Sequence, residues 1–194
     1  MKKLLWAIGD PQEKVAMIHV AGTVGKGSTV AMICAMLQGN GYTVGAYTSP
    51  HLTDIRERVV VNGEMVQEGT FTELLKVVVQ AATKNDLTPT FFELITAVAF
   101  KHFADEAVDI AVIETGLGGR FDSVTACNAK LQLFTKISMD HCHILGNSII
   151  KIATDKASAI HNNATCLSVK QNKKVKKIAL FHILSQKNKV NLLY

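Results

Sequence analysis

The chain has 194 residues, 48% of them hydrophobic and 19% charged, which supports one well-packed core and excludes an intrinsically disordered protein. Its four cysteines form no C-x-x-C pair, so we expect buried thiols in a reducing, cytoplasmic compartment rather than a disulfide framework. The formal net charge of +5 comes largely from lysines near the C-terminus without interleaved aromatics, which disfavours nucleic acid as a partner. The apolar run after the N-terminal lysines is too short for a signal peptide or a membrane span.

The first half of the chain predicts a strand, a helix, a second strand and a hairpin. The strand covers 16–20 and runs into the helix at 28–38, whose apolar residues fall on one face. The second strand, 43–47, ends before Pro50. The segment 59–66 carries Asn62-Gly63 at its centre, the signature of a two-residue hairpin turn.

The second half begins with two helices, each predicted to open with a capping box, Thr70 with Glu73 and Thr90 with Glu93. The unbroken apolar run at 108–113 predicts a central strand buried on both faces. A strand at 131–137, a helix at 149–159, a short strand at 165–169 and an amphipathic helix at 172–186 follow. This alternation predicts an α/β fold with a mostly parallel sheet covered by helices.

A glycine-rich turn joins the first strand to the first helix, in the sequence IHVAGTVGKGST at 18–29. Glycines let backbone N–H groups approach an anion, the helix N-terminus adds positive potential, and Lys26 adds a full charge. Strict P-loop spacing is not met, because Val20 stands at the first glycine position and Gly27 separates Lys26 from Ser28. The turn still predicts phosphate binding, with a purely structural turn as the alternative.

Polar residues follow the carboxyl ends of the predicted strands, where ligands bind in open α/β sheets. They are Lys26 and Ser28, then Ser49 and His51, then Glu114, Gly116, Gly118, Gly119 and Arg120, and finally Asp140, His141 and His143. A magnesium nucleotide needs such a mixture of hard oxygen ligands and cations. Each residue type also has a simpler interpretation: a salt-bridged Glu114, a structural His141, a solvated Lys156 and a core Phe91 and Phe92.

Five ordered segments resemble the folylpolyglutamate synthase and dihydrofolate synthase branch of the Mur ligase superfamily. They are IHVAGTVGKGST, YTSPHLTDIRERVVVNGE, TFFELITAVAF, VIETGLGGRFD and SMDHCHILGNSIIKIATDKASAI. The resemblance implies a three-layer, P-loop NTPase-like domain of the Mur ligase central type. It also implies ATP and Mg²⁺ as cofactors, transfer of the γ-phosphate to a pteroate or folate carboxylate, and attack by the amine of L-glutamate to form an amide.

The resemblance also assigns roles by position. The phosphate loop comprises Gly22, Thr23, Gly25, Lys26, Gly27, Ser28 and Thr29. Magnesium is assigned to Ser49, Glu114 and His141, and the pterin substrate to His51, Arg58, Phe91, Phe92 and Glu93. Catalytic roles are assigned to Lys26, His141 and Lys156, and since Lys156 matches a lysine that the family carboxylates, the resemblance replaces its solvated interpretation.

Finally, the resemblance implies that residues 1–194 are a single, incomplete ATP-binding domain, a monomer without the C-terminal glutamate-binding domain. The chain departs from the family pattern at Val24, at 122–125 and at 155–158, which favours weaker binding of nucleotide or magnesium. Two alternatives are therefore considered: a non-catalytic nucleotide-binding module from a decayed paralogue, and another Mur-type amide ligase.

Overall fold

The computed structural model describes residues 1–161, 164–178 and 189–191. These residues form one sheet of eight strands in the order β4-β3-β2-β5-β1-β6-β7-β8. The strands are β1 Ala16–Ala21, β2 Val44–Tyr47, β3 Val59–Val61, β4 Glu64–Met65, β5 Ile110–Glu114, β6 Leu131–Phe134, β7 Thr165–Ser168 and β8 Lys189–Asn191. At one edge of the sheet, β3 pairs antiparallel with both β2 and β4. The other neighbouring strands, β2, β5, β1, β6, β7 and β8, pair in parallel, as the alternating pattern predicts.

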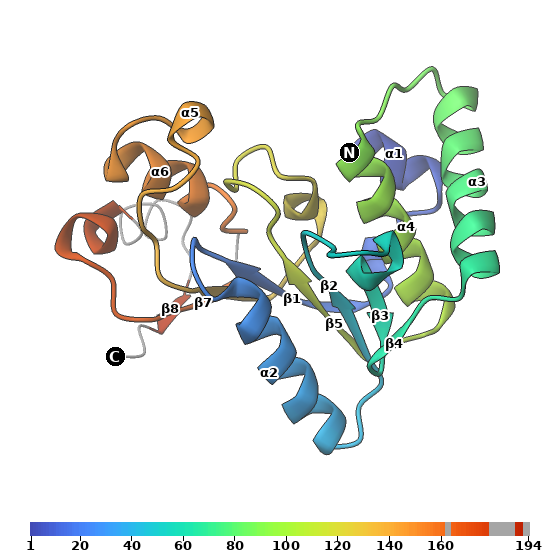
Figure 1. Cartoon of the computed structure of the whole chain (residues 1–194), viewed down its shortest axis with the longest axis horizontal. Coiled ribbons are helices and arrows are strands. Elements are labelled where there is room, and N and C mark those ends of the chain that lie inside the picture. Colours follow the sequence, from blue (N-terminus) through green and yellow to red (C-terminus); the bar gives the residue numbers. More distant parts are fainter. Residues whose placement is uncertain (162–163, 179–188, 192–194) are drawn as a thin grey trace.

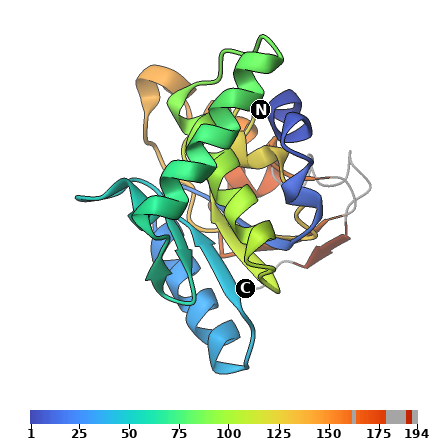
Figure 2. The same cartoon turned by 90° about the vertical axis from the view of Figure 1, so that its right-hand side faces the viewer.

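Helices lie on both faces of this sheet, which gives three layers (Figures 1 and 2). They are α1 Lys2–Ala7, α2 Lys26–Gly39, α3 Glu68–Lys84, α4 Phe91–Asp105, α5 Cys142–Leu145 and α6 Ile149–Ala157, with 3-10 helices η1 Pro11–Glu13, η2 Ile55–Arg58 and η3 Ser123–Ala126. Helix α2 packs on one face, whereas α4 and α6 pack on the other. None of the helices in the described ranges is both long and apolar enough to cross a lipid bilayer.

The central strand β5 explains why the sheet is covered on both sides. Val112 packs in the cluster beneath α2, whereas Ala111 and Ile113 pack in the cluster beneath α4. All three are fully buried, as an apolar run without alternation indicates. On the neighbouring strand, a Cβ at Gly45 would lie 2.8 Å from the Phe103 ring, so glycine lets α4 approach the sheet closely.

Most of the predicted elements form, with shifted ends. The hairpin is confirmed, with φ of 50° at Asn62 and 84° at Gly63, as a type I′ turn requires. The capping box of Thr90 is confirmed by hydrogen bonds in both directions with Glu93. The capping box of Thr70 is wrong, because α3 already begins at Glu68.

Other differences concern short elements. The strand predicted at 131–137 ends at Phe134, and α1, α5, the 3-10 helices and β8 lack a prediction. Each of these unpredicted elements has six residues or fewer, too few for hydrophobic periodicity to reveal. Of the helix predicted at 172–186, residues 173–178 are helical and 179–186 lie outside the described residues.

Candidate phosphate and substrate site

The glycine-rich turn between β1 and α2 is the first part of the site. Gly25 is the N-cap of α2 and has a φ of 86°, in the left-handed region that glycine tolerates best. The backbone N–H groups of Thr23 and Val24 donate to the carbonyl of Lys136, which ties the turn to the segment after β6. The first N–H groups of α2 have no partner within the helix, so they can donate to an anion.

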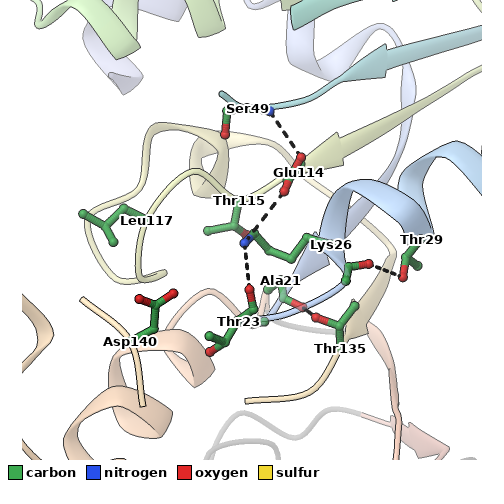
Figure 3. Close-up of polar contacts among 12 residues, drawn as sticks. Ala21, Thr23, Lys26, Thr29, Ser49, Glu114, Thr115, Leu117, Thr135 and Asp140 are labelled. Carbon is green, nitrogen blue, oxygen red and sulfur yellow. Dashed lines mark hydrogen bonds and ion pairs between the residues drawn. The ribbon is translucent and has the colours of Figure 1, made fainter. Parts of the chain in front are cut away.

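Lys26, Glu114 and Ser49 meet at the carboxyl ends of β1, β5 and β2 (Figure 3). The ammonium nitrogen of Lys26 lies 3.7 Å from Oε1 of Glu114 and donates to the Thr23 carbonyl at 3.4 Å. The other carboxylate oxygen accepts the backbone N–H of Ser49 at 3.2 Å. Burial raises the pKa of Glu114, and the Ser49 N–H and the charge of Lys26 oppose that rise. The interpretation of Glu114 as an ion-paired carboxylate therefore holds within the site.

A cavity of about 640 Å³ opens beside this group. It is lined by Lys26, Ser49, Pro50, Arg58, Thr90, Phe92, Gly116, Leu117, Phe121, Asp122, Ser123, His141, Ile144, Leu145 and Asp155. The sheet topology thus brings the ends of β1, β2 and β5 and the start of α5 to one cavity, although they are far apart in sequence.

His141 lines that cavity and is half exposed. Its backbone N–H donates to the Asp140 carboxylate at 2.8 Å, and its Nε2 lies 3.6 Å from the same side chain. Its φ of 47° places it in the left-handed region, which non-glycine residues seldom adopt outside special sites. His141 is therefore not a buried core histidine, and its assignment to the metal stays a prediction.

Lys156 is buried on α6, so its interpretation as a solvated lysine is wrong. The side chain is 4% exposed, and its ammonium nitrogen donates to the carbonyl of Gly22 in the phosphate turn at 2.8 Å. Burial, and to a lesser extent the charge of Lys26, lowers the pKa of Lys156 to about 8. A Cβ at Gly119 would lie 2.8 Å from the carbonyl oxygen of Lys156, so the turn after β5 also packs closely on α6.

Only some of the residues assigned to the substrate line the cavity. Arg58 lines the cavity, and its Nε donates to Nδ1 of His51 at 2.8 Å. Phe92 lines the cavity as well, whereas Phe91 is 55% exposed with the Arg58 guanidinium 5.8 Å above its ring, so Phe91 is not a core residue. Glu93 caps α4, pairs with the N-terminal ammonium at 2.6 Å and lines a neighbouring cavity.

The Thr29 hydroxyl is engaged within α2, and its assignment to phosphate binding stays a prediction. Its hydroxyl donates to the Gly25 carbonyl at 2.7 Å, within the first turn of α2 (Figure 3). It lines a separate apolar groove beside β6 and β7 instead of the cavity described above.

Two acidic residues, one in the loop beside the site and one in the cavity, lack a sequence prediction. Glu57 accepts the backbone N–H groups of Leu52, Thr53 and Asp54, and these bonds lower its pKa to about 2. Asp122 lines the cavity, and burial raises its pKa to about 6. The spacing of Asp54 and Glu57 is that of a capping box, a signal that could have revealed the ordered loop.

No protein-family model matches the chain. It is 47% identical over 165 residues to the dihydrofolate synthase/folylpolyglutamate synthase of Bacillus subtilis, covering 82% of the chain and 38% of that relative. It is 37% identical over 162 residues to the folylpolyglutamate synthase of Lacticaseibacillus casei, covering 81% and 38%.

Solved structures of folylpolyglutamate synthases are also similar to the chain. An FPGS-AMPPCP complex superposes with a TM-score of 0.93 at 31% identity, covering 97% of this chain and 48% of that one. Mycobacterium tuberculosis folylpolyglutamate synthase complexed with ADP and AMPPCP gives a TM-score of 0.91 at 31% identity, covering 98% and 45%. The chain therefore spans less than half the length of the proteins it matches.

Proposed function

We infer that this chain, which matches the N-terminal portion of the folylpolyglutamate and dihydrofolate synthase family, binds ATP and the acid substrate of an amide-forming ligase. In this proposal the ligase adds L-glutamate to a folate, or to dihydropteroate, by way of an acyl phosphate. The observation that carries the proposal is the meeting of Lys26, Glu114 and Ser49 beside one cavity, next to the N-terminus of α2.

The donor set fits a magnesium ion. Glu114 is buried, and the one N–H and one distant ammonium that contact it leave acceptor positions on its carboxylate. In the proposal Glu114 and the Ser49 hydroxyl would supply hard oxygen ligands, which magnesium prefers, and His141 would supply an imidazole nitrogen. When bound, the ion neutralises charge on the phosphates.

The chain's own residues would supply positioning and charge. Lys26 places an ammonium group at the phosphate turn, and the first N–H groups of α2 point toward the same side. The cavity lined by Phe92 and Leu117 then holds the acid substrate beside Lys26. Phosphoryl transfer asks for alignment and electrostatic stabilisation more than covalent help, so these parts suit it.

The proposal includes the wider setting of the enzyme. Residues 1–194 act as one ATP-binding unit, and the glutamate-binding domain expected of the family is a separate part of the enzyme. The partners are small molecules and not nucleic acid, and the protein is a monomer. All four cysteines are free thiols, which supports a cytoplasmic location.

Calorimetric titration of the chain with AMPPCP and magnesium tests the proposal. We expect binding that weakens at least about tenfold in Lys26→Met, because one phosphate contact with a full charge is lost. Lys76→Met, which removes an exposed lysine on α3, is the matched control and leaves binding unchanged. Absence of AMPPCP binding, or equal affinity in wild type and Lys26→Met, would overturn the proposal. Binding of AMPPCP without binding of pteroate would favour the non-catalytic nucleotide module.

A further inference from the structure

We propose that His19, Cys127 and His161 form a second metal site, which takes a thiophilic divalent ion such as Zn²⁺. The three residues come from strand β1, from the position after η3 and from the segment that follows α6. Their ligand atoms, two imidazole nitrogens and one sulfur, all lie within 4.8 Å of one another. None of the three lines the cavity beside Lys26, so this cluster is separate from the proposed nucleotide and substrate site.

The spacing of the cluster is close to that around a coordinated ion. Zinc binds sulfur at about 2.3 Å and nitrogen at about 2.0 Å, so the ligand atoms of a tetrahedral site lie about 3.3 to 3.8 Å apart. Sγ of Cys127 and Nε2 of His161 lie 3.7 Å apart and already meet this condition. The distances to the third ligand, His19, need to shorten by no more than about 1.5 Å.

The donor types favour zinc over magnesium. Thiolate sulfur and imidazole nitrogen are ligands that zinc prefers, whereas magnesium takes oxygen ligands. Both Cys127 and His19 are buried. Burial raises the pKa of the Cys127 thiol to about 12, so the incoming ion displaces the thiol proton to solvent. Burial lowers the pKa of His19 to about 3, so its ring is neutral at pH 7, the form that binds metals.

His19 is oriented by hydrogen bonds on both of its ring nitrogens. Nε2 lies 2.7 Å from the Thr115 hydroxyl, and Nδ1 lies 3.0 Å from the amide nitrogen of Gln132. Metal binding exchanges one of these bonds and keeps the other, and such a bond on the far nitrogen is what orients the imidazole of a metal ligand. Gln132 is held without His19, because its amide nitrogen donates to the Ala159 carbonyl at 2.7 Å and its oxygen accepts the backbone N–H of His161 at 2.8 Å. The ion therefore displaces a single hydrogen bond of this network.

A cavity of about 310 Å³ gives the ion a path to the cluster. Cys127 and His161 line it, together with Gln12. The Oε1 atom of Gln12 is buried and has no hydrogen-bond partner among the described residues. Three protein ligands leave the fourth tetrahedral position open to water. A metal-bound water in this cavity would have the Gln12 oxygen as an acceptor.

The charges around the cluster are mixed. Burial, and then the charges of Lys2 and Lys130, lower the pKa of His161, so this ring is also neutral at pH 7. The two lysines oppose the binding of a cation. The thiolate formed at Cys127 and the carboxylate of Glu13, which lines the same cavity, favour it.

Cobalt titration tests the site, because Co²⁺ accepts the same ligands as Zn²⁺ and a bound thiolate gives a sulfur-to-cobalt charge-transfer band. Wild type, Cys127→Val, His161→Gln, His19→Gln and the control Cys166→Val are titrated with Co²⁺ in excess Mg²⁺. Cys166 is the matched control because it is another buried free thiol, on β7. We expect a single Co²⁺ per wild-type chain, with the band and with displacement by Zn²⁺. The band is lost in Cys127→Val, affinity falls at least about tenfold in each histidine variant, and Cys166→Val behaves as wild type.

Urea unfolding with and without Zn²⁺ gives a second measurement. Zinc should raise the unfolding midpoint of wild type and of Cys166→Val, because an ion that binds only the folded chain stabilises it. It should leave the midpoint of His161→Gln nearly unchanged at the same zinc concentration.

Other results would overturn the inference. Absence of the charge-transfer band in wild type refutes the site, and this result requires no variant to fold. A band that persists in Cys127→Val places the metal at another thiol. Unchanged affinity in both histidine variants shows a thiolate contact without the cluster, in which case Cys127 and His161 form only a hydrogen bond. Cobalt binding without the band shows binding to surface groups only.

Discussion

Lys156 offers a quantitative test of charge burial, through the substitution Lys156→Met. Methionine is unbranched like lysine, is one atom shorter, and removes the charge. Folding lowers the pKa of Lys156 from 10.5 to about 8. One pKa unit corresponds to about 1.4 kcal/mol, so the protonated lysine lowers the stability of the folded protein by roughly 3 kcal/mol. The variant loses the hydrogen bond to the Gly22 carbonyl, a cost of about 1 kcal/mol. We therefore expect a net gain of about 2 kcal/mol at pH 7.

The stability of the wild type should rise with pH, because the pKa of Lys156 is lower in the folded chain than in the unfolded chain. Below about pH 8 the lysine is protonated in both folded and unfolded chains, so the folded wild type carries the whole penalty. Between about pH 8 and 10.5 the unfolded chain holds more protons than the folded chain, so wild-type stability rises with pH. The advantage of the variant should therefore shrink from about 2 kcal/mol at pH 7 to near zero at pH 10.

Urea unfolding of both proteins at pH 7 and pH 10 measures this difference, without nucleotide or magnesium. The buffers are purged of carbon dioxide, because a carbamate on the same nitrogen would replace the titration. Lys151→Met, an exposed position on the same helix, is the control and should change stability by less than about 0.5 kcal/mol at either pH. A stability difference between Lys156→Met and wild type that is the same at both pH values would refute the reasoning.

Four further substitutions test the packing and capping described above by urea unfolding. Thr90→Ala should cost about 1 kcal/mol because it removes a capping box, whereas Thr70→Ala, inside α3, should cost less than half of that; equal costs would contradict the observed start of α3. Gly22→Ala should cost at least about 2 kcal/mol, since φ is +140° and the new Cβ would overlap the Thr135 hydroxyl; a neutral result would contradict this turn geometry. Phe103→Ala should cost about 3 to 5 kcal/mol as a fully buried ring, and a cost below about 1 kcal/mol would place that ring outside the core.

Strands and long helices could be predicted from the sequence because their signals are local. The apolar run of β5 and the Asn62-Gly63 turn depend on neighbouring residues alone. The glycine-rich turn and the polar strand ends likewise predict the edge of the sheet where Lys26, Ser49 and Glu114 meet.

The rest of the site depends on contacts between distant segments. Lys156 is buried and bonds to the carbonyl of Gly22, 134 residues away, a contact that the pattern of α6 does not contain. Likewise Glu93 is occupied by the N-terminal ammonium, 92 residues away, although its sequence position fits a substrate-facing residue. Tertiary contacts of this kind override the local interpretation of a charged side chain.

The position of β1 at the centre of the sheet affects how the protein folds during its synthesis on the ribosome. Ala16 pairs with Ile110 and Ile18 pairs with Leu131, so both neighbours of β1 are synthesised roughly ninety or more residues after it. Until then this apolar strand has exposed edges, a state prone to association with other chains. Because the N–H groups of Thr23 and Val24 bond to Lys136, the glycine-rich turn that follows β1 can reach its final geometry only after β6 and Lys136 have emerged, which would make the proposed nucleotide site a late product of folding.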